Sequence, residues 1–197
     1  MANDDQIVLP KVTCTSTKCD EGLHCFRPKK GKVKVEDYQG GKCQACDADI
    51  VDWNRIYSRD LDDVDTLFAA LRKEYVRHVF WTIQLDLKVS WKKFQTGRVK
   101  MEEAVYKRLQ RSVSCSGRES IWDGRQTPMT PKNIIYCAQH ATATCCRKCI
   151  RYWHNIPYDR DLTDSELQYL TGLVMHYIDI RLFDNPPVGT QLVLPLS

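Results

Sequence analysis

Apolar residues recur at steps of three and four in three stretches of the chain, which is the spacing of one face of an α-helix. The stretches cover residues 61–86, residues 98–114 and the run after Thr163. Thr163 and Glu166 form a capping box, which predicts the start of the third helix. The apolar positions are Val64, Leu67, Phe68, Leu71, Tyr75 and Val79, then Met101, Ala104, Val105 and Leu109, then Leu167, Leu170, Val174, Tyr177, Ile178 and Leu182.

Other segments have a less decisive pattern. Residues 80–89 continue the first helix or form a short strand, because Ile83, Leu85 and Leu87 alternate with polar residues. The run IIYCAQH, residues 134–140, is interpreted as a short apolar strand or the approach to a turn. The run CCRKCIRYWH is expected to be helical and to stop at Asn155, ahead of Pro157, because proline does not fit inside a helix.

The N-terminal part contains few apolar residues. LHCF and KVKVED, residues 23–26 and 32–37, look like short strands joined by a turn-prone PKKGK. With cysteine pairs on either side, this pattern predicts a small β zinc ribbon over residues 11–55. We therefore expect an α+β protein with two domains: the ribbon at 11–55, and a mainly helical domain at 56–197.

Most of the ten cysteines fall in two groups, and each group contains a C-x-x-C, the commonest half-site for zinc. In the first group, Gly40 and Gly41 precede Cys43 and allow backbone amides to point at thiolate sulfur. Cys25 is expected to be a buried core thiol, and a ligand set with Cys25 in place of Cys14 stays open. The predicted ligands of the first zinc are Cys14, Cys19, Cys43 and Cys46.

The second group packs two histidines and three cysteines into fifteen residues, and it predicts a second zinc site. Cys145 is an alternative donor. Thiol–disulfide exchange and an iron–sulfur cluster using Cys137 and Cys115 are competing chemistries. Zinc-dependent deamination is disfavoured, because Ala141 and Thr142 follow the first histidine where a catalytic glutamate is needed. The predicted ligands are His140, Cys146, Cys149 and His154.

Positive charge is unevenly distributed, although the net charge is only +4. Residues 88–118 contain nine Lys or Arg against Glu102 and Glu103, and a second basic cluster lies within residues 27–34. Such clusters are typical of a phosphate-binding face or of a solvated surface. The residues expected to contact nucleic acid are Lys29, Lys30, Lys32, Lys92, Lys93, Arg98, Lys100, Lys107, Arg108 and Arg111.

These features favour a zinc-binding accessory or regulatory protein that binds nucleic acid. A metal-dependent enzyme acting on nucleic acid or nucleotides is the first alternative, with His140 or His154 as a base and Arg147 and Lys148 holding phosphate. An adaptor for an acidic protein is the second. The polar, acidic start of the chain is unlike a secretory signal, and no run has the ~18 apolar residues of a membrane helix. We therefore expect a cytoplasmic protein that does not enter a membrane.

Four motifs in the second half of the chain resemble those of an uncharacterised bacterial family of unknown function. They are Gln126-Thr127-Pro128, the block from Ala138 to Cys149, the turn from Trp153 to Pro157, and the helix start from Thr163 to Glu166. The resemblance covers the last third to half of the chain and implies no activity. The first cysteine group looks like an extension found on part of such a family.

Overall fold

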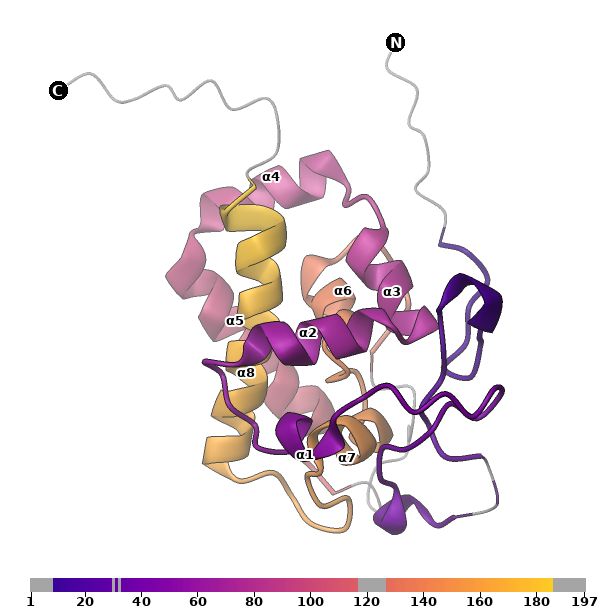
Figure 1. The fold of residues 1–197 in the computed structure, drawn as a ribbon. Coiled ribbons are helices and arrows are strands. Elements are labelled where there is room, and N and C mark those ends of the chain that lie inside the picture. Colours follow the sequence, from indigo (N-terminus) through magenta and orange to yellow (C-terminus); the bar gives the residue numbers. More distant parts are fainter. Residues whose placement is uncertain (1–8, 30, 32, 117–126, 186–197) are drawn as a thin grey trace, which may run out of the picture.

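The structure is a computed structural model that describes residues 9–29, 31, 33–116 and 127–185. Within these ranges the chain forms eight α-helices and no β-strand (Figure 1). Short 3₁₀ turns occupy Cys19–Glu21 (η1) and Val35–Asp37 (η2), and a π-helix, Asp179–Phe183 (η3), extends the last helix. The α-helices are α1 Trp53–Ile56, α2 Val64–Arg72, α3 Tyr75–Thr82, α4 Leu87–Thr96, α5 Arg98–Val113, α6 Ile134–Ala141, α7 Arg147–His154 and α8 Asp164–Ile178.

Helix α8 is the centre of the helical core. It packs against α5 and α6, and α6 packs in turn against α3. The predicted capping box is confirmed, because Thr163 accepts from the Glu166 amide and the Glu166 carboxylate accepts from the Thr163 amide. Gly172 lies so close to Leu61 that a β-carbon there would come within 2.9 Å of the leucine methyl group. The core side of α8 consists of Leu167, Leu170, Leu173, Val174, Tyr177 and Ile178.

The first apolar stretch forms two helices, α2 and α3, which are separated at Lys73 and Glu74. The backbone of Glu74 is extended, and it forms an isolated parallel bridge with His24. The His24 amide donates to the Lys73 carbonyl oxygen at 2.7 Å, and the Tyr75 amide donates to that of His24 at 2.9 Å. The N-terminal segment therefore contacts the helical part at the break between these two helices.

Three further segments, at residues 80–89, 134–140 and 147–154, are helical over all or part of their length. The expected strand at residues 134–140 is wrong, since these residues form α6, whose N-cap Asn133 accepts from the Ile135 amide. Residues 80–89, whose pattern fits either a helix or a strand, hold the end of α3 and the start of α4. Helix α7 stops before Asn155 as predicted, and Asn155 adopts the left-handed conformation common after a helix end.

The predicted α+β fold with a β zinc ribbon is wrong. Residues 9–52 form only the two short 3₁₀ turns and two isolated bridges among the described positions, so they contain no ribbon sheet. Alternation alone does not make a strand, because a strand needs a neighbour for its backbone groups. Val35–Asp37 turns as η2 instead, and the Glu36 carbonyl oxygen accepts from the Arg151 side chain of α7 at 2.8 Å.

The N-terminal segment, residues 9–52, lies along one side of the helical part (Figure 1). It shares one hydrophobic core with the helices, to which it adds Val12, Phe26, Tyr38 and Val51. The Phe26 ring lies 6.1 Å, centroid to centroid, from that of Trp153 on α7, edge to face. The division into domains at residues 55 and 56 stays a prediction, and these contacts show that the two parts are packed against each other.

None of the helices in the described ranges has the length and apolar content needed to cross a lipid bilayer.

Candidate metal sites

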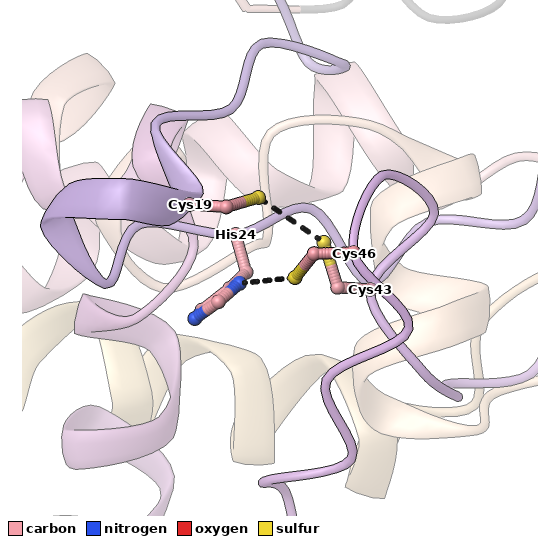
Figure 2. A group of neighbouring side chains, drawn as sticks. All are labelled: Cys19, His24, Cys43 and Cys46. Atoms are coloured by element: carbon pink, nitrogen blue, oxygen red, sulfur yellow. Dashed lines mark hydrogen bonds between the residues drawn. The ribbon is translucent and has the colours of Figure 1, made fainter.

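The first candidate metal site consists of Cys19, His24, Cys43 and Cys46 (Figure 2). One donor atom from each residue lies within 4.8 Å of the others. The Cys19 and Cys43 sulfurs are 3.8 Å apart, and the Cys46 sulfur is 3.4 Å from Nδ1 of His24. Cys43 and His24 are buried, whereas Cys46 is exposed, so this site lies at the surface of the protein.

A tight turn presents Cys43 and Cys46 to the first site. The Cys43 amide donates to the Ala48 carbonyl oxygen, the Asp47 amide donates to that of Cys43, and Asp47 has a φ of 57°. The Ala45 amide points at the Cys43 sulfur at 3.5 Å. Burial acts to raise the pKa of Cys43, but donation from backbone amides lowers that pKa to about 6. The turn therefore favours the thiolate, which is the form that binds metal.

The first site brings together three of its four predicted ligands. Cys14 is not part of this group, and His24, which was not among the predicted ligands, takes the fourth position. Cys25 is fully buried, as expected, and accepts a hydrogen bond at 3.0 Å from the Gln44 side-chain amide. The sequence contained a signal for His24 as a ligand, because His24 lies close in sequence to Cys19 and imidazole is a common zinc donor.

The second candidate metal site consists of Cys145, Cys146 and Cys149, whose sulfur atoms lie within 4.8 Å of one another. All three side chains are buried, with exposed fractions of 3, 3 and 0%. Cys146 is the N-cap of α7 and Cys149 lies in its first turn, where the positive end of the helix dipole favours thiolates. This site is therefore enclosed in the core, unlike the first.

A buried ion pair lies against the second site. Arg77 on α3 donates from Nη2 to the Cys149 sulfur at 3.0 Å and from Nη1 to the Cys145 sulfur at 3.5 Å. Its Nε donates to the Glu74 carboxylate at 3.1 Å, and both side chains are 0% exposed. Tyr152 and Trp153 of α7 also donate to Glu74, at 2.7 and 2.9 Å. The network fixes Arg77 so that its guanidinium faces the sulfurs.

The two predicted histidine ligands of the second site have other partners. Nε2 of His140 lies 3.2 Å from the Pro128 carbonyl oxygen, and its ring stacks on Phe80. Nε2 of His154 lies 3.0 Å from the Thr142 carbonyl oxygen, and its Nδ1 is 3.2 Å from the Tyr169 hydroxyl. Burial lowers the pKa of both rings to about 4, so both are neutral near pH 7. Neither histidine belongs to the group of three sulfurs.

The predicted phosphate-binding residues divide between two sides of the molecule. Figure 1 shows α5 on the opposite side from the N-terminal segment, so the two basic clusters do not form one surface. Arg98 pairs with Asp179 at 2.9 Å, Lys107 with Glu103 at 3.8 Å, and Arg108 lies over the Tyr136 ring. Lys93 and Arg108 are partly buried, and Lys30 and Lys32 lie outside the described residues, as does Gln126, the first residue of the motifs predicted from the sequence. The exposed members are Lys29, Lys92, Arg98, Lys100, Lys107 and Arg111.

Two clusters of soft donors on a helical scaffold define a candidate metal-binding protein. The chain belongs to the family described as a domain of unknown function (DUF4186), whose model matches residues 65–179. Arg77 and the three cysteines of the second site lie inside the matched region, whereas the first site lies before it. No solved structure matches the chain.

Proposed function

We propose that the protein binds two zinc ions and that both have a structural role, holding the N-terminal segment and the helical core in place. The observation that carries this proposal is the convergence of Cys19, His24, Cys43 and Cys46 within 4.8 Å. A tetrahedral zinc with bonds to sulfur of about 2.3 Å places two thiolates about 3.8 Å apart. The Cys19–Cys43 separation of 3.8 Å supports that geometry.

The donor set favours zinc over other common metals. Three thiolates and one imidazole are soft or borderline donors, whereas calcium and magnesium require oxygen ligands. Four protein ligands also close the coordination shell of zinc, which is typical of structural rather than catalytic sites. The second site is enclosed in the core, so a substrate has no direct access to it. Both arguments favour a structural protein over the metal-dependent enzyme considered from the sequence.

A structural role also explains how residues 9–52 become ordered with so little regular secondary structure. Ordering each residue costs about 1–2 kcal/mol of conformational entropy, and this segment buries few large apolar side chains. Zinc binding contributes folding free energy directly, because the site does not exist in the unfolded chain. The zinc joins the turn at Cys43 to His24, whose backbone pairs with the break between α2 and α3.

The test is the zinc content of the purified protein and of one ligand variant. We expect two zinc ions per chain in the wild-type protein, and one in Cys43→Ser. Cys115→Ser is the matched control, because Cys115 is exposed and belongs to neither site, and it should keep both metals. A wild-type protein without zinc, or with iron in its place, would contradict the proposal, as would a Cys43→Ser variant that retains two zinc ions.

Nucleic-acid binding is a second candidate function, and the observation that favours it is the exposure of Lys92, Lys100 and Arg111 on α4 and α5. Exposed cations can neutralise phosphates and release counterions, which makes binding depend on salt. Gel-shift titrations at rising salt test it, with Lys100→Glu combined with Arg111→Glu as the variant. Wild-type protein that binds no nucleic acid at low salt, or whose binding does not weaken as salt rises, would remove this candidate.

A further inference from the structure

The buried residue Glu74 lies between the two candidate metal sites. It is the N-cap residue of α3, its backbone is extended, and it is 0% exposed. Its backbone forms a bridge with that of His24, a donor of the first site. Its carboxylate accepts from Arg77, whose guanidinium donates to sulfurs of the second site. One residue therefore contacts both a donor of the first site and the cation that faces the second.

The link to the first site runs through the backbone of His24. The His24 amide donates to the Lys73 carbonyl oxygen, and the His24 carbonyl oxygen accepts from the Tyr75 amide. These two bonds lie on either side of Glu74 in the chain. Nδ1 of the same histidine lies 3.4 Å from the Cys46 sulfur (Figure 2). Because zinc holds its ligands in a fixed geometry, a zinc bound here restrains the His24 ring and the backbone that pairs with Glu74.

The link to the second site runs through the Glu74 carboxylate. It accepts from Nε of Arg77 at 3.1 Å, from the Tyr152 hydroxyl at 2.7 Å and from Nε1 of Trp153 at 2.9 Å. All four side chains of this Glu74 network are fully buried. Nη2 of Arg77 donates in turn to the Cys149 sulfur at 3.0 Å. A continuous path of hydrogen bonds thus joins the α2–α3 break to the second site.

The N-terminal segment contacts the Glu74 network at a second place. Phe26 is 1% exposed, and its ring packs edge to face on that of Trp153. Trp153 is one of the three donors to the Glu74 carboxylate. Phe26 follows His24 by only two positions, so the pairing of one and the packing of the other occur together. Both contacts depend on how this short stretch of the N-terminal segment is placed.

We infer that Glu74 couples the two metal sites, so that a metal ion bound at the first site strengthens metal binding at the second. This inference rests on the proposed function, in which both sites bind zinc. The element with two states is the N-terminal segment, either packed on the helices or detached from them. Packing costs the segment conformational entropy, and a metal at the first site has already removed part of that entropy. Metal at the first site therefore favours the packed state.

The packed state in turn favours metal at the second site. It keeps water from the Glu74 carboxylate, and hydrogen bonds in such a water-free environment are strong, so Arg77 is held in one position. Three thiolates around one divalent zinc carry a net negative charge, which is costly in the core unless a cation offsets it. When the segment detaches, water reaches Glu74 and its hold on Arg77 weakens. By linkage, metal at the second site must favour the packed state by the same factor.

Cadmium NMR with a competing chelator tests the coupling on the full chain. Wild-type protein loaded with cadmium ions should give two resonances, and Cys43→Ser should remove the one that belongs to the first site. The chelator concentration that halves the other resonance measures the affinity of the second site. We expect this affinity to fall about tenfold in Cys43→Ser, which lies in the usual range of coupling between sites. It should stay unchanged in the matched control Cys115→Ser, because Cys115 is exposed and belongs to neither site.

Glu74→Gln tests whether Glu74 carries the coupling. The amide keeps the shape of the side chain but removes the charge that pairs with Arg77. In this background the effect of Cys43→Ser on the second site should shrink to less than about twofold. Glu166→Gln is the matched control, because Glu166 is also a buried carboxylate paired with an arginine but lies outside the Glu74 network. The full effect of Cys43→Ser should persist in that background.

The outcomes separate this inference from the proposed function. Wild-type protein with fewer than two bound metal ions would contradict the proposed function, and the coupling with it. Two bound ions, with equal affinity of the second site in wild type and Cys43→Ser, would overturn the coupling alone. An undiminished effect of Cys43→Ser in Glu74→Gln would overturn the role of Glu74. If Glu74→Gln does not fold, Arg77→Met takes its place with the same expectation, because it removes the partner of the carboxylate.

Discussion

The two candidate metal sites contain the same C-x-x-C motif but lie in opposite environments. The first is at the surface, and backbone amides of a turn point at its Cys43 sulfur. The second is in the core, and the Arg77 side chain provides donors to its sulfurs. The backbone amides at the Cys43 sulfur belong to the turn that contains the cysteine, so they are present whenever this turn forms. The Arg77 side chain is instead positioned by α3 and by its ion pair with Glu74. The first arrangement is local and the second depends on the tertiary structure.

This difference predicts how each site responds to damage. Loss of the first site should loosen the N-terminal segment and leave the helical core intact. Loss of the second should leave Arg77 and the remaining sulfurs buried without a metal, at the junction of α3, α6 and α7. We therefore expect damage to the second site to spread through the core.

The largest expected effect is that of Cys149→Ala. Zinc supplies on the order of 10 kcal/mol of folding free energy in isolated fingers, which is comparable to the whole stability of a typical domain. Cys149→Ala should therefore be insoluble, or compact without cooperative unfolding. Cys46→Ala should keep a cooperative thermal transition and a helical spectrum, with the loss limited to the N-terminal segment. Circular dichroism melts measure both outcomes.

A cooperative, near-wild-type transition in Cys149→Ala would break the comparison between the two sites. It would show that the second site is not the structural centre, and it would revive a catalytic interpretation of that site. Loss of the cooperative transition in Cys46→Ala would also contradict the comparison, because the folding of residues 56–197 would then depend on the first site. The two domains predicted from the sequence would in that case be one folding unit.

The sequence predicted α2, α5, α7 and α8 from local signals, whereas it did not identify α6 as a helix. Residues 98–114 were expected to be helical and α5 spans Arg98–Val113, while the capping box located the start of α8. The prediction of a β zinc ribbon was wrong because a strand depends on a partner elsewhere in the structure and not on a local signal. KVKVED has strand-like alternation, but η2 packs against α7 rather than beside a second strand. Nothing within the segment reveals which neighbour it will have.

The metal donors show the same limit. The C-x-x-C pairs were found from spacing alone, since both members lie on one turn. The more distant donor His24 was not, because it lies beside the sulfurs of Cys43 and Cys46 only once the N-terminal segment has paired with the break between α2 and α3. His140 and His154 had suitable spacing for ligands, but Nε2 of each ring lies within hydrogen-bonding distance of a carbonyl oxygen.

The second prediction concerns the arginine that faces the second site. Arg77→Met removes one partner of a fully buried ion pair, leaving Glu74 and the sulfurs without their cation, which typically costs 3–5 kcal/mol. Arg55→Met is the matched control, because Arg55 pairs with Asp63 at the surface, where the loss should be small. Denaturant melts compare the variants, and zinc analysis should show weakened retention of one metal in Arg77→Met only. Equal stability of the two variants would mean that the second site does not depend on side-chain charge.

The smallest expected effect comes from a carboxylate that belongs to neither candidate metal site, which separates general loss of stability from loss of a metal ligand. Hydrogen bonding to Arg160 lowers the pKa of Glu166 from 4.5 to about 2. A depressed carboxyl pKa stabilises the fold above the unfolded value, near pH 4.5, and this contribution disappears as the pH falls toward 2. Glu166→Gln keeps the capping geometry but removes the charge, so it should lower the free energy of unfolding by up to about 1 kcal/mol at pH 7, since Arg160 is partly exposed.

Thermal melts of the wild-type protein and of Glu166→Gln should converge as the pH drops through that window, while zinc content at pH 7 stays the same in both. A Glu166→Gln variant that loses zinc would show that any loss of core stability releases metal. Zinc loss in Arg77→Met would then be no evidence that Arg77 supports the second site.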